Sequence, residues 1–178
     1  METERLLLRK LKMQDATKIE EYAGDYQVAK TTLSIPHPYP KGGGISFIQA
    51  VERSQKYGKL VLFALEEKSS GQFVGVINLN FIKPHRRAEL AYWIGTPFWG
   101  KGYGTEAAKK VVEYGFNELN LNKIHAMAFL NNPGSWRIME KIGMQREGLL
   151  RQHIVRFNEV HDVLYYGILR QDLQEEFE

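Results

Sequence analysis

The chain has 178 residues, of which 43% are hydrophobic and 25% charged, enough for one domain with its own core. It has no cysteine, which excludes disulfides, thiolate metal ligands and a cysteine nucleophile. The net charge of +3 is too small to indicate nucleic-acid binding, and no apolar run reaches the roughly 20 residues that span a bilayer. The N-terminus, "METERLLLRKLK", carries charges where a signal peptide has a hydrophobic stretch. We therefore expect one cytoplasmic domain over residues 1–178, with neither nucleic acid nor membrane as a partner.

The first part of the chain begins with a short apolar segment, residues 5–11, which predicts a strand. Asp15 is placed to cap a helix that runs to about Tyr22. Residues 34–44 contain three prolines and three glycines, which predict a loop. Core spacing of apolar residues then predicts a helix at about 45–57.

The middle of the chain predicts three strands in succession. Residues 60–67 and 72–81 are joined by "KSSG", a hairpin signal, and residues 86–94 follow the turn "KPHR". Strand alternation puts Glu89 and Trp93 on one face of the last strand and Tyr92 on the other.

The remaining pattern predicts a helix at 102–117, a strand at 123–130, a short helix within 131–143 and a hairpin of 144–155 with 160–169. This order is typical of an α/β protein of the α+β type, with a mixed, mostly antiparallel sheet flanked by helices.

The segment "WGKGYGTE", residues 99–106, places three glycines at alternate positions directly before a helix. Unpaired N–H groups at a helix N-terminus attract anions, and glycine lets a ligand approach the backbone closely. The spacing matches neither a nucleotide P-loop nor a dinucleotide fingerprint. Taken alone, the segment predicts either a phosphate site or a tight strand-to-helix turn.

Several motifs in order distinguish these alternatives. "TERLLLR", "AELAYW", "WGKGYGTEA", "NPGSWRIMEKIGM", "EGLLR" and "HDVLYY" lie between Thr3 and about Asp172. Together they resemble the GNAT superfamily of acetyl-CoA-dependent N-acetyltransferases, and most of all its Rim-type branch, which acetylates N-terminal amines of ribosomal proteins. The resemblance implies a single GNAT-like domain whose sheet is splayed in the middle.

The resemblance also implies that acetyl-CoA is the co-substrate. The glycine-rich loop would bind its diphosphate through backbone N–H groups, the backbone of residues 93–95 would pair with the pantetheine arm, and Asn132 would bond the arm from the other side. The implied cofactor-binding residues are Trp93, Ile94, Gly95, Trp99, Gly100, Lys101, Gly102, Tyr103, Gly104, Thr105, Asn132, Arg137 and Lys141.

Acetyl transfer requires a group that takes a proton from the amine and one that protonates the leaving thiolate. Glu89 is the candidate base, acting through water; alternatively it pairs with Arg86 or Arg87 on a solvated face. Ser135 matches the serine proposed in this branch as the acid; a role as the N-cap of the short helix is compatible with that. Without cysteine, direct attack in a ternary complex is the simplest route.

Two positions depart from the family pattern. Met139 stands where many members carry a tyrosine acid, and Ile154, beside His153, stands where some Rim-type enzymes have a glutamate base. A relay through His153 is therefore an alternative to Glu89. Tyr39, His153 and Tyr165 are candidates for binding the amine, with core packing as the alternative for the tyrosines. The five histidines show no metal-binding spacing, so we expect no metal.

The sequence thus predicts an acetyltransferase that acts on a primary amine, with the N-terminus of a protein such as a ribosomal protein as the acceptor. A polyamine, an amino acid or an antibiotic amine would need the same chemistry. A CoA-binding regulatory module without activity is the alternative from a different class. Both a monomer and a homodimer are compatible with the sequence.

Overall fold

The structure, a computed structural model, describes residues 1–173, so the predicted domain boundary at 178 lies outside the described residues. Its centre is a seven-stranded sheet in the order β1-β2-β3-β4-β5-β7-β6. Neighbouring strands are antiparallel except β4 and β5, which are parallel. The strands are β1 (Leu6–Arg9), β2 (Leu60–Glu67), β3 (Phe73–Ile82), β4 (Arg87–Ile94), β5 (Lys123–Phe129), β6 (Gln145–Arg156) and β7 (Glu159–Leu169). The predicted mixed, mostly antiparallel sheet is confirmed.

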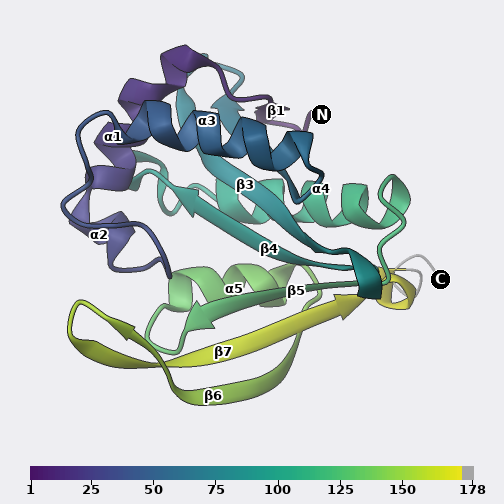
Figure 1. Ribbon diagram of the computed structural model, residues 1–178. Coiled ribbons are helices and arrows are strands. Elements are labelled where there is room, and N and C mark those ends of the chain that lie inside the picture. The colour runs from purple at the N-terminus through teal and green to yellow at the C-terminus, as the bar shows by residue number, and fades with distance from the viewer. Residues whose placement is uncertain (174–178) are drawn as a thin grey trace.

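Helices cover both faces of the sheet (Figure 1). They are α1 (Ala16–Gly24), α2 (Tyr26–Ala29), α3 (Gly43–Lys56), α4 (Tyr103–Asn117) and α5 (Pro133–Lys141). The N-terminal helices α1 and α3 lie together on one face, and α4 and α5 lie on the other (Figure 1). Among residues 1–173, no helix is both long and apolar enough to cross a membrane.

The sheet opens between its two parallel strands. β4 and β5 pair only from Arg87 to Glu89, opposite residues 123–125, and then diverge (Figure 1). The N–H of Gly95 bonds to the Val74 carbonyl of β3, and hydrogen bonding alternates along an antiparallel strand. The backbone groups of Tyr92 and Ile94 therefore face the opening. The predicted splay in the middle of the sheet, beside the strand that contains Tyr92 and Ile94, is confirmed.

The core forms on both faces of the sheet, because apolar residues recur at helical spacing in the helices and successive side chains of each strand point to opposite faces. In α4 the apolar residues recur at helical spacing and form a buried stripe, with Ala107, Ala108, Val111 and Val112 all at most 1% exposed. This stripe packs α4 against β3 and β4, which fixes the position of the helix N-terminus near the end of β4.

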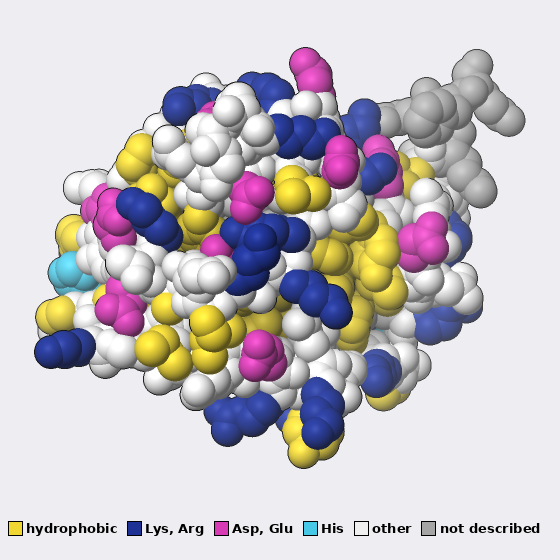
Figure 2. Space-filling model, turned by 90° about the horizontal axis from the view of Figure 1, so that it is seen from above, with side chains coloured by type: hydrophobic (Ala, Val, Ile, Leu, Met, Phe, Trp, Pro, Cys, Tyr) yellow, Lys and Arg dark blue, Asp and Glu magenta, His cyan; other side chains and the backbone are white. Residues whose placement is uncertain are grey.

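The outer surface over the N-terminal helices carries both signs of charge. Figure 2, viewed from the top of Figure 1, shows Lys and Arg side chains interspersed with Asp and Glu and with hydrophobic side chains. Mixed charge of this kind is typical of an ordinary solvent-exposed surface.

Some predicted boundaries were wrong for identifiable reasons. Asp15 is the N-cap residue of α1, as predicted, but its side chain makes no capping hydrogen bond. Its carboxylate instead accepts from the Lys12 N–H at 2.7 Å and pairs with Arg9 at 2.8 Å. The predicted strand at 5–11 is limited to Leu6–Arg9. The helix predicted from residue 45 starts at Gly43, and the short α2 was missed.

Gly44, in the first turn of α3, lies directly against the backbone of α1. A Cβ on Gly44 would overlap the carbonyl oxygen of Ala16 and lie 3.0 Å from its Cα. The glycine therefore permits close contact between the first turns of α1 and α3.

We predict that Gly44→Ala lowers the free energy of unfolding by about 2–3 kcal/mol, because overpacking against rigid backbone is not easily relieved. Urea denaturation measures the change. Gly148→Ala is the matched control, since nothing lies within 4 Å of its added Cβ, and it should stay within about 0.5 kcal/mol of the parent. Equal effects of the two variants would contradict this account of the contact.

Candidate active site

A cavity of about 640 Å³ lies where β4 parts from β5. Its walls come from four segments far apart in sequence: Thr31 and Thr32, the end of β4 at 92–94, residues of the loop at 98–105, and residues of α5 at 132–141. Side chains from both faces of β4, Tyr92 and Trp93, line it. The cavity therefore extends from the N-terminus of α4 into the opening of the sheet.

The backbone N–H groups at one end of this cavity are unpaired. Those of residues 100–105 donate no hydrogen bond to any other part of the chain that the structure describes. The first bond of α4 runs from the Glu106 N–H to the Gly102 carbonyl at 3.1 Å. Such N–H groups carry the positive end of the helix dipole and bind anions.

The glycines of this loop are required by its geometry. Gly100 and Gly102 have φ values of 75° and 83°, in the left-handed region that other residues rarely adopt. A Cβ on Gly104 would lie 2.7 Å from Ile138 Cδ1. On the opposite wall, Arg137 and Lys141 supply positive charge. Free amides, a bare backbone and two cations together fit a diphosphate.

Two predicted contacts of the loop differ in detail. The ammonium group of Lys101 lies over the ring of Phe98, 5.1 Å from its centroid, and Lys101 does not line the cavity. The side chain of Tyr103 donates a hydrogen bond to Glu67. The Lys101 ammonium group and the Tyr103 hydroxyl are therefore both engaged in contacts within the chain.

The end of β4 offers less free backbone than predicted. The indole N–H of Trp99 donates to the Ile94 carbonyl at 2.7 Å, and the Gly95 N–H bonds to Val74 at 2.9 Å. The backbone of Trp93 faces β3 by the alternation of the antiparallel pair. This narrows the prediction for residues 93–95 to one group, the N–H of Ile94, which faces the opening.

Ser135 and Tyr92 meet on the α5 side of the opening. The Tyr92 hydroxyl donates to the Ser135 carbonyl at 3.0 Å and lies 3.1 Å from the Ser135 hydroxyl. Burial raises the pKa of Tyr92 to about 12, so this phenol keeps its proton at neutral pH. Ser135 occupies the third position of α5, whose N-cap is Asn132, so the predicted capping role of Ser135 is wrong.

Glu89 lies on the other face of β4, in a cluster of polar side chains. It is half-buried, and burial raises the pKa of its carboxyl group, while a hydrogen bond from Asn80 opposes the rise. Arg86 instead donates to the carbonyl of Asn120, and within residues 1–173 no ion pair to Glu89 is formed. The alternative of a paired, solvated carboxylate is therefore wrong.

Comparison with known proteins agrees with this geometry. Residues 5–145 match the family model of the acetyltransferase (GNAT) domain, which covers more than half of the chain. The chain is 32% identical over 171 residues to N-acetyltransferase p20 of Bacillus licheniformis, covering 96% of each chain.

This chain belongs to the GNAT acetyltransferases.

Its fold matches the crystal structure of a GNAT-family acetyltransferase from Bacillus anthracis with a TM-score of 0.85 and 30% identity, covering 96% of this chain and 98% of the other. Two shorter matches have acceptors in their names. "Putative ribosomal N-acetyltransferase YdaF" of Bacillus subtilis is 36% identical over 60% of this chain and 58% of its own. Spermidine N(1)-acetyltransferase of Escherichia coli is 35% identical over 56% of each chain. GNAT enzymes use acetyl-CoA, and the free amides described above fit its diphosphate.

Not all predicted residues meet at the GNAT cavity. Asn132 lines it, and its side-chain amide donates to the Thr31 carbonyl at 3.1 Å. Tyr39 packs instead against Gly43 of α3, where its ring would lie 2.8 Å from an added Cβ. His153 lies in a separate cavity of about 670 Å³ at the irregular part of β6.

Tyr165 lies in the polar cluster of Glu89 rather than along the cavity wall. It stacks on His125 at a centroid distance of 5.1 Å. Burial lowers the pKa of His125 to about 4, and the charges of Arg87 and Lys123 act in the same direction, so His125 is neutral at pH 7. In the described part of the chain, no group of three or more histidine, aspartate or glutamate side chains is placed to hold a metal ion.

Sequence reasoning missed several residues at this site. Thr31 and Thr32 line the cavity but carry no local signal, because they follow a four-residue helix that only tertiary contacts stabilise. Tyr92 was assigned a face but no role. Arg5 and Glu106 belong to quoted motifs, but their ion pair joins segments far apart in the sequence and is seen only in the fold.

We predict that Ser135→Ala lowers kcat roughly 100-fold, the usual contribution of a general acid, while KM for acetyl-CoA changes little. Steady-state kinetics with acetyl-CoA varied at a saturating amine give both constants. Tyr92→Phe tests the partner hydroxyl, and the double variant should be no slower than Ser135→Ala, since the two groups act together. A large rise in KM with unchanged kcat would assign Ser135 to binding instead.

Proposed function

We propose that this GNAT enzyme transfers the acetyl group of acetyl-CoA to the N-terminal α-amine of a protein, such as a ribosomal protein, by direct attack in a ternary complex. The observation that carries the proposal is the single cavity joining the free N–H groups at α4 to the opened sheet beside Tyr92 and Ser135. A donor bound by its diphosphate at one end is thereby directed to the catalytic groups at the other.

The residues around the opening have distinct roles in this proposal. Acetyl-CoA supplies an activated thioester carbonyl when it is bound. Glu89 receives, through water, the proton that the amine loses as its nitrogen bonds to the acetyl carbon. The Ile94 N–H faces the opening, where it can stabilise negative charge on the acetyl oxygen. Ser135 gives a proton to the sulfur as the carbon–sulfur bond breaks and then regains a proton from water, and Tyr92 holds the serine in place.

The charge around Glu89 favours an acceptor with a single amine. Lys123 pairs with Glu147 at 2.6 Å, and Arg87 lies near the same cluster. A polyamine carries several positive charges, and its binding would require several unpaired carboxylates at the acceptor site. An α-amine also has a pKa of about 8, against about 10 for a side-chain amine, so a carboxylate base suffices for it at neutral pH. The name of YdaF is in line with this acceptor, whereas that of the spermidine enzyme gives the competing one.

Mass spectrometry tests the acceptor directly. The enzyme is incubated with acetyl-CoA and one of three kinds of amine. The first is a peptide with a ribosomal-protein N-terminus, the second is the same peptide with its α-amine blocked and a lysine side chain left free, and the third is spermidine. We predict one added acetyl group, about 42 mass units, on the free N-termini only. Modification of spermidine alone would overturn the proposed acceptor, and modification of no amine would overturn the proposed function.

We predict that Glu89→Gln abolishes most turnover without destabilising the protein. A general base contributes roughly 100-fold or more to the rate, and the variant removes it. Burial raises the pKa of Glu89, which means that the folded protein disfavours the charged form, so a neutral isostere should leave the melting temperature equal or higher. Kinetics and thermal unfolding of the same samples check both effects. Full activity of the variant would exclude Glu89 as the base.

A further inference from the structure

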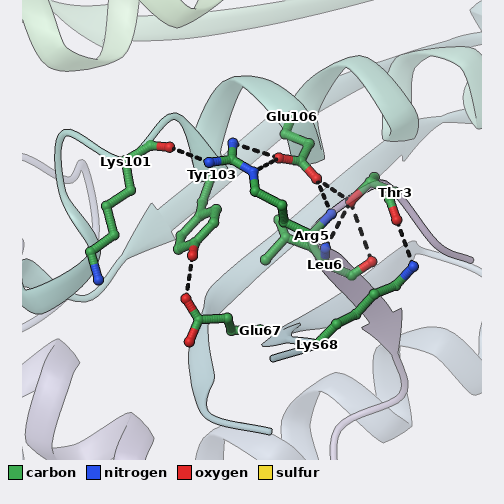
Figure 3. A network of polar contacts seen from close by, with 8 residues as sticks. All are labelled: Thr3, Arg5, Leu6, Glu67, Lys68, Lys101, Tyr103 and Glu106. Carbon is green, nitrogen blue, oxygen red and sulfur yellow. Dashed lines mark hydrogen bonds and ion pairs between the residues drawn. The ribbon is translucent and has the colours of Figure 1, made fainter. Parts of the chain in front are cut away.

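Arg5, just before β1, contacts the glycine-rich loop from outside the cavity (Figure 3). Its guanidinium donates to the Lys101 carbonyl at 2.9 Å and pairs with Glu106 of α4 at 2.6 Å. The same guanidinium lies over the ring of Tyr103, 4.8 Å from its centroid. One side chain thus contacts the loop, the first residue of α4 and the first turn of that helix.

The bond to Lys101 determines the orientation of the next amide. In a trans peptide, the carbonyl of one residue and the N–H of the next point in opposite directions. Because the Lys101 carbonyl points toward Arg5, the Gly102 N–H points away from Arg5. Gly102 lines the cavity, and glycine can adopt several φ values besides the observed 83°, so an external contact has to select the orientation of that peptide.

Arg5 also neutralises the one acidic side chain in the first turn of α4. The carboxylate of Glu106 accepts from the Arg5 N–H at 2.8 Å, from the Thr3 hydroxyl at 2.5 Å and from the Arg5 side chain at 2.7 Å. Without the guanidinium, the carboxylate of Glu106 would stay unneutralised in the first turn of the helix whose N-terminus we assign to a diphosphate. Its negative charge would then oppose binding of that anion.

We propose that Arg5 is a positioning residue for the diphosphate of the acetyl donor, acting through the peptide between Lys101 and Gly102 and through Glu106. The inference rests on the proposed binding of that diphosphate to the loop. Arg5 itself does not line the cavity, so its effect on the donor is indirect. A lysine at this position can pair with Glu106. Unlike the planar guanidinium, it cannot donate at the same time to the Glu106 carboxylate and to the Lys101 carbonyl in the same geometry.

The experiment compares three acetyl donors. Acetyl-CoA carries the diphosphate and a 3′-phosphate, acetyl-dephospho-CoA carries only the diphosphate, and S-acetylpantetheine carries neither. For Arg5→Gln we expect KM to rise about tenfold for the first two donors with kcat nearly unchanged. We expect kcat/KM for S-acetylpantetheine to stay within about twofold of the parent. A tenfold change corresponds to about 1.4 kcal/mol of binding free energy.

Two further variants separate positioning from simple structural support. Arg5→Lys should retain most of the defect, since it preserves the charge but not the geometry. Lys68→Gln is the matched control, because Lys68 bonds to the Thr3 carbonyl of the same N-terminal segment at 2.6 Å and pairs with Glu2, without contacting the loop. It should leave all three donors unaffected. Thermal unfolding of each variant accompanies the kinetics.

The outcomes separate this inference from the proposed function. Equal losses with all three donors would reduce Arg5 to a structural role, and a defect confined to acetyl-CoA would indicate a direct contact with the 3′-phosphate; either result overturns the inference. Unchanged constants in Arg5→Gln would overturn it as well. If the parent enzyme shows no preference for diphosphate-bearing donors over S-acetylpantetheine, the proposed loop site itself fails.

Discussion

Unpaired backbone amides at the start of α4 are the feature on which the rest of the site depends. Residues 100–105 donate no backbone hydrogen bond to the described part of the chain, so other contacts have to hold the loop in place. The apolar stripe of α4 anchors the helix against the sheet, and left-handed glycines turn the chain into it. Arg5 and Glu106 complete the support from outside.

The opening of the sheet supplies the second requirement, access to the reacting atoms from two sides. β4 pairs with β5 over three residues only. Successive side chains of β4 point to opposite faces of the sheet, so the proposed catalytic residues lie on both faces. Glu89 lies on the face that α1 and α3 cover, whereas Tyr92 reaches Ser135 on the face of α5. In the proposed reaction, the amine therefore loses its proton on one face of the sheet and the sulfur gains one on the other.

Much of the fold could be predicted from periodicity, since the α4 stripe and the strands around Val76 and Leu90 follow patterns that burial requires. The misses share a physical cause, namely contacts between distant segments. Asp15 resembles a helix cap in sequence, but Arg9 and Lys12 bind its carboxylate. At the site, the resemblance to the family predicted the glycine-rich loop and Ser135. The hydrogen bonds that join Tyr92 to Ser135 and Trp99 to the Ile94 carbonyl could not be predicted, because they form only in the folded chain.

Nuclear magnetic resonance of the ¹⁵N-labelled enzyme tests the central claim most directly. CoA is titrated into the protein while the backbone amide resonances of residues 100–105 are followed, with the amides of α3 as an internal reference. The account predicts large, saturable changes at the loop amides, and none of comparable size with pantetheine, which lacks the diphosphate. Saturable binding of CoA that leaves those amide resonances unmoved would contradict it.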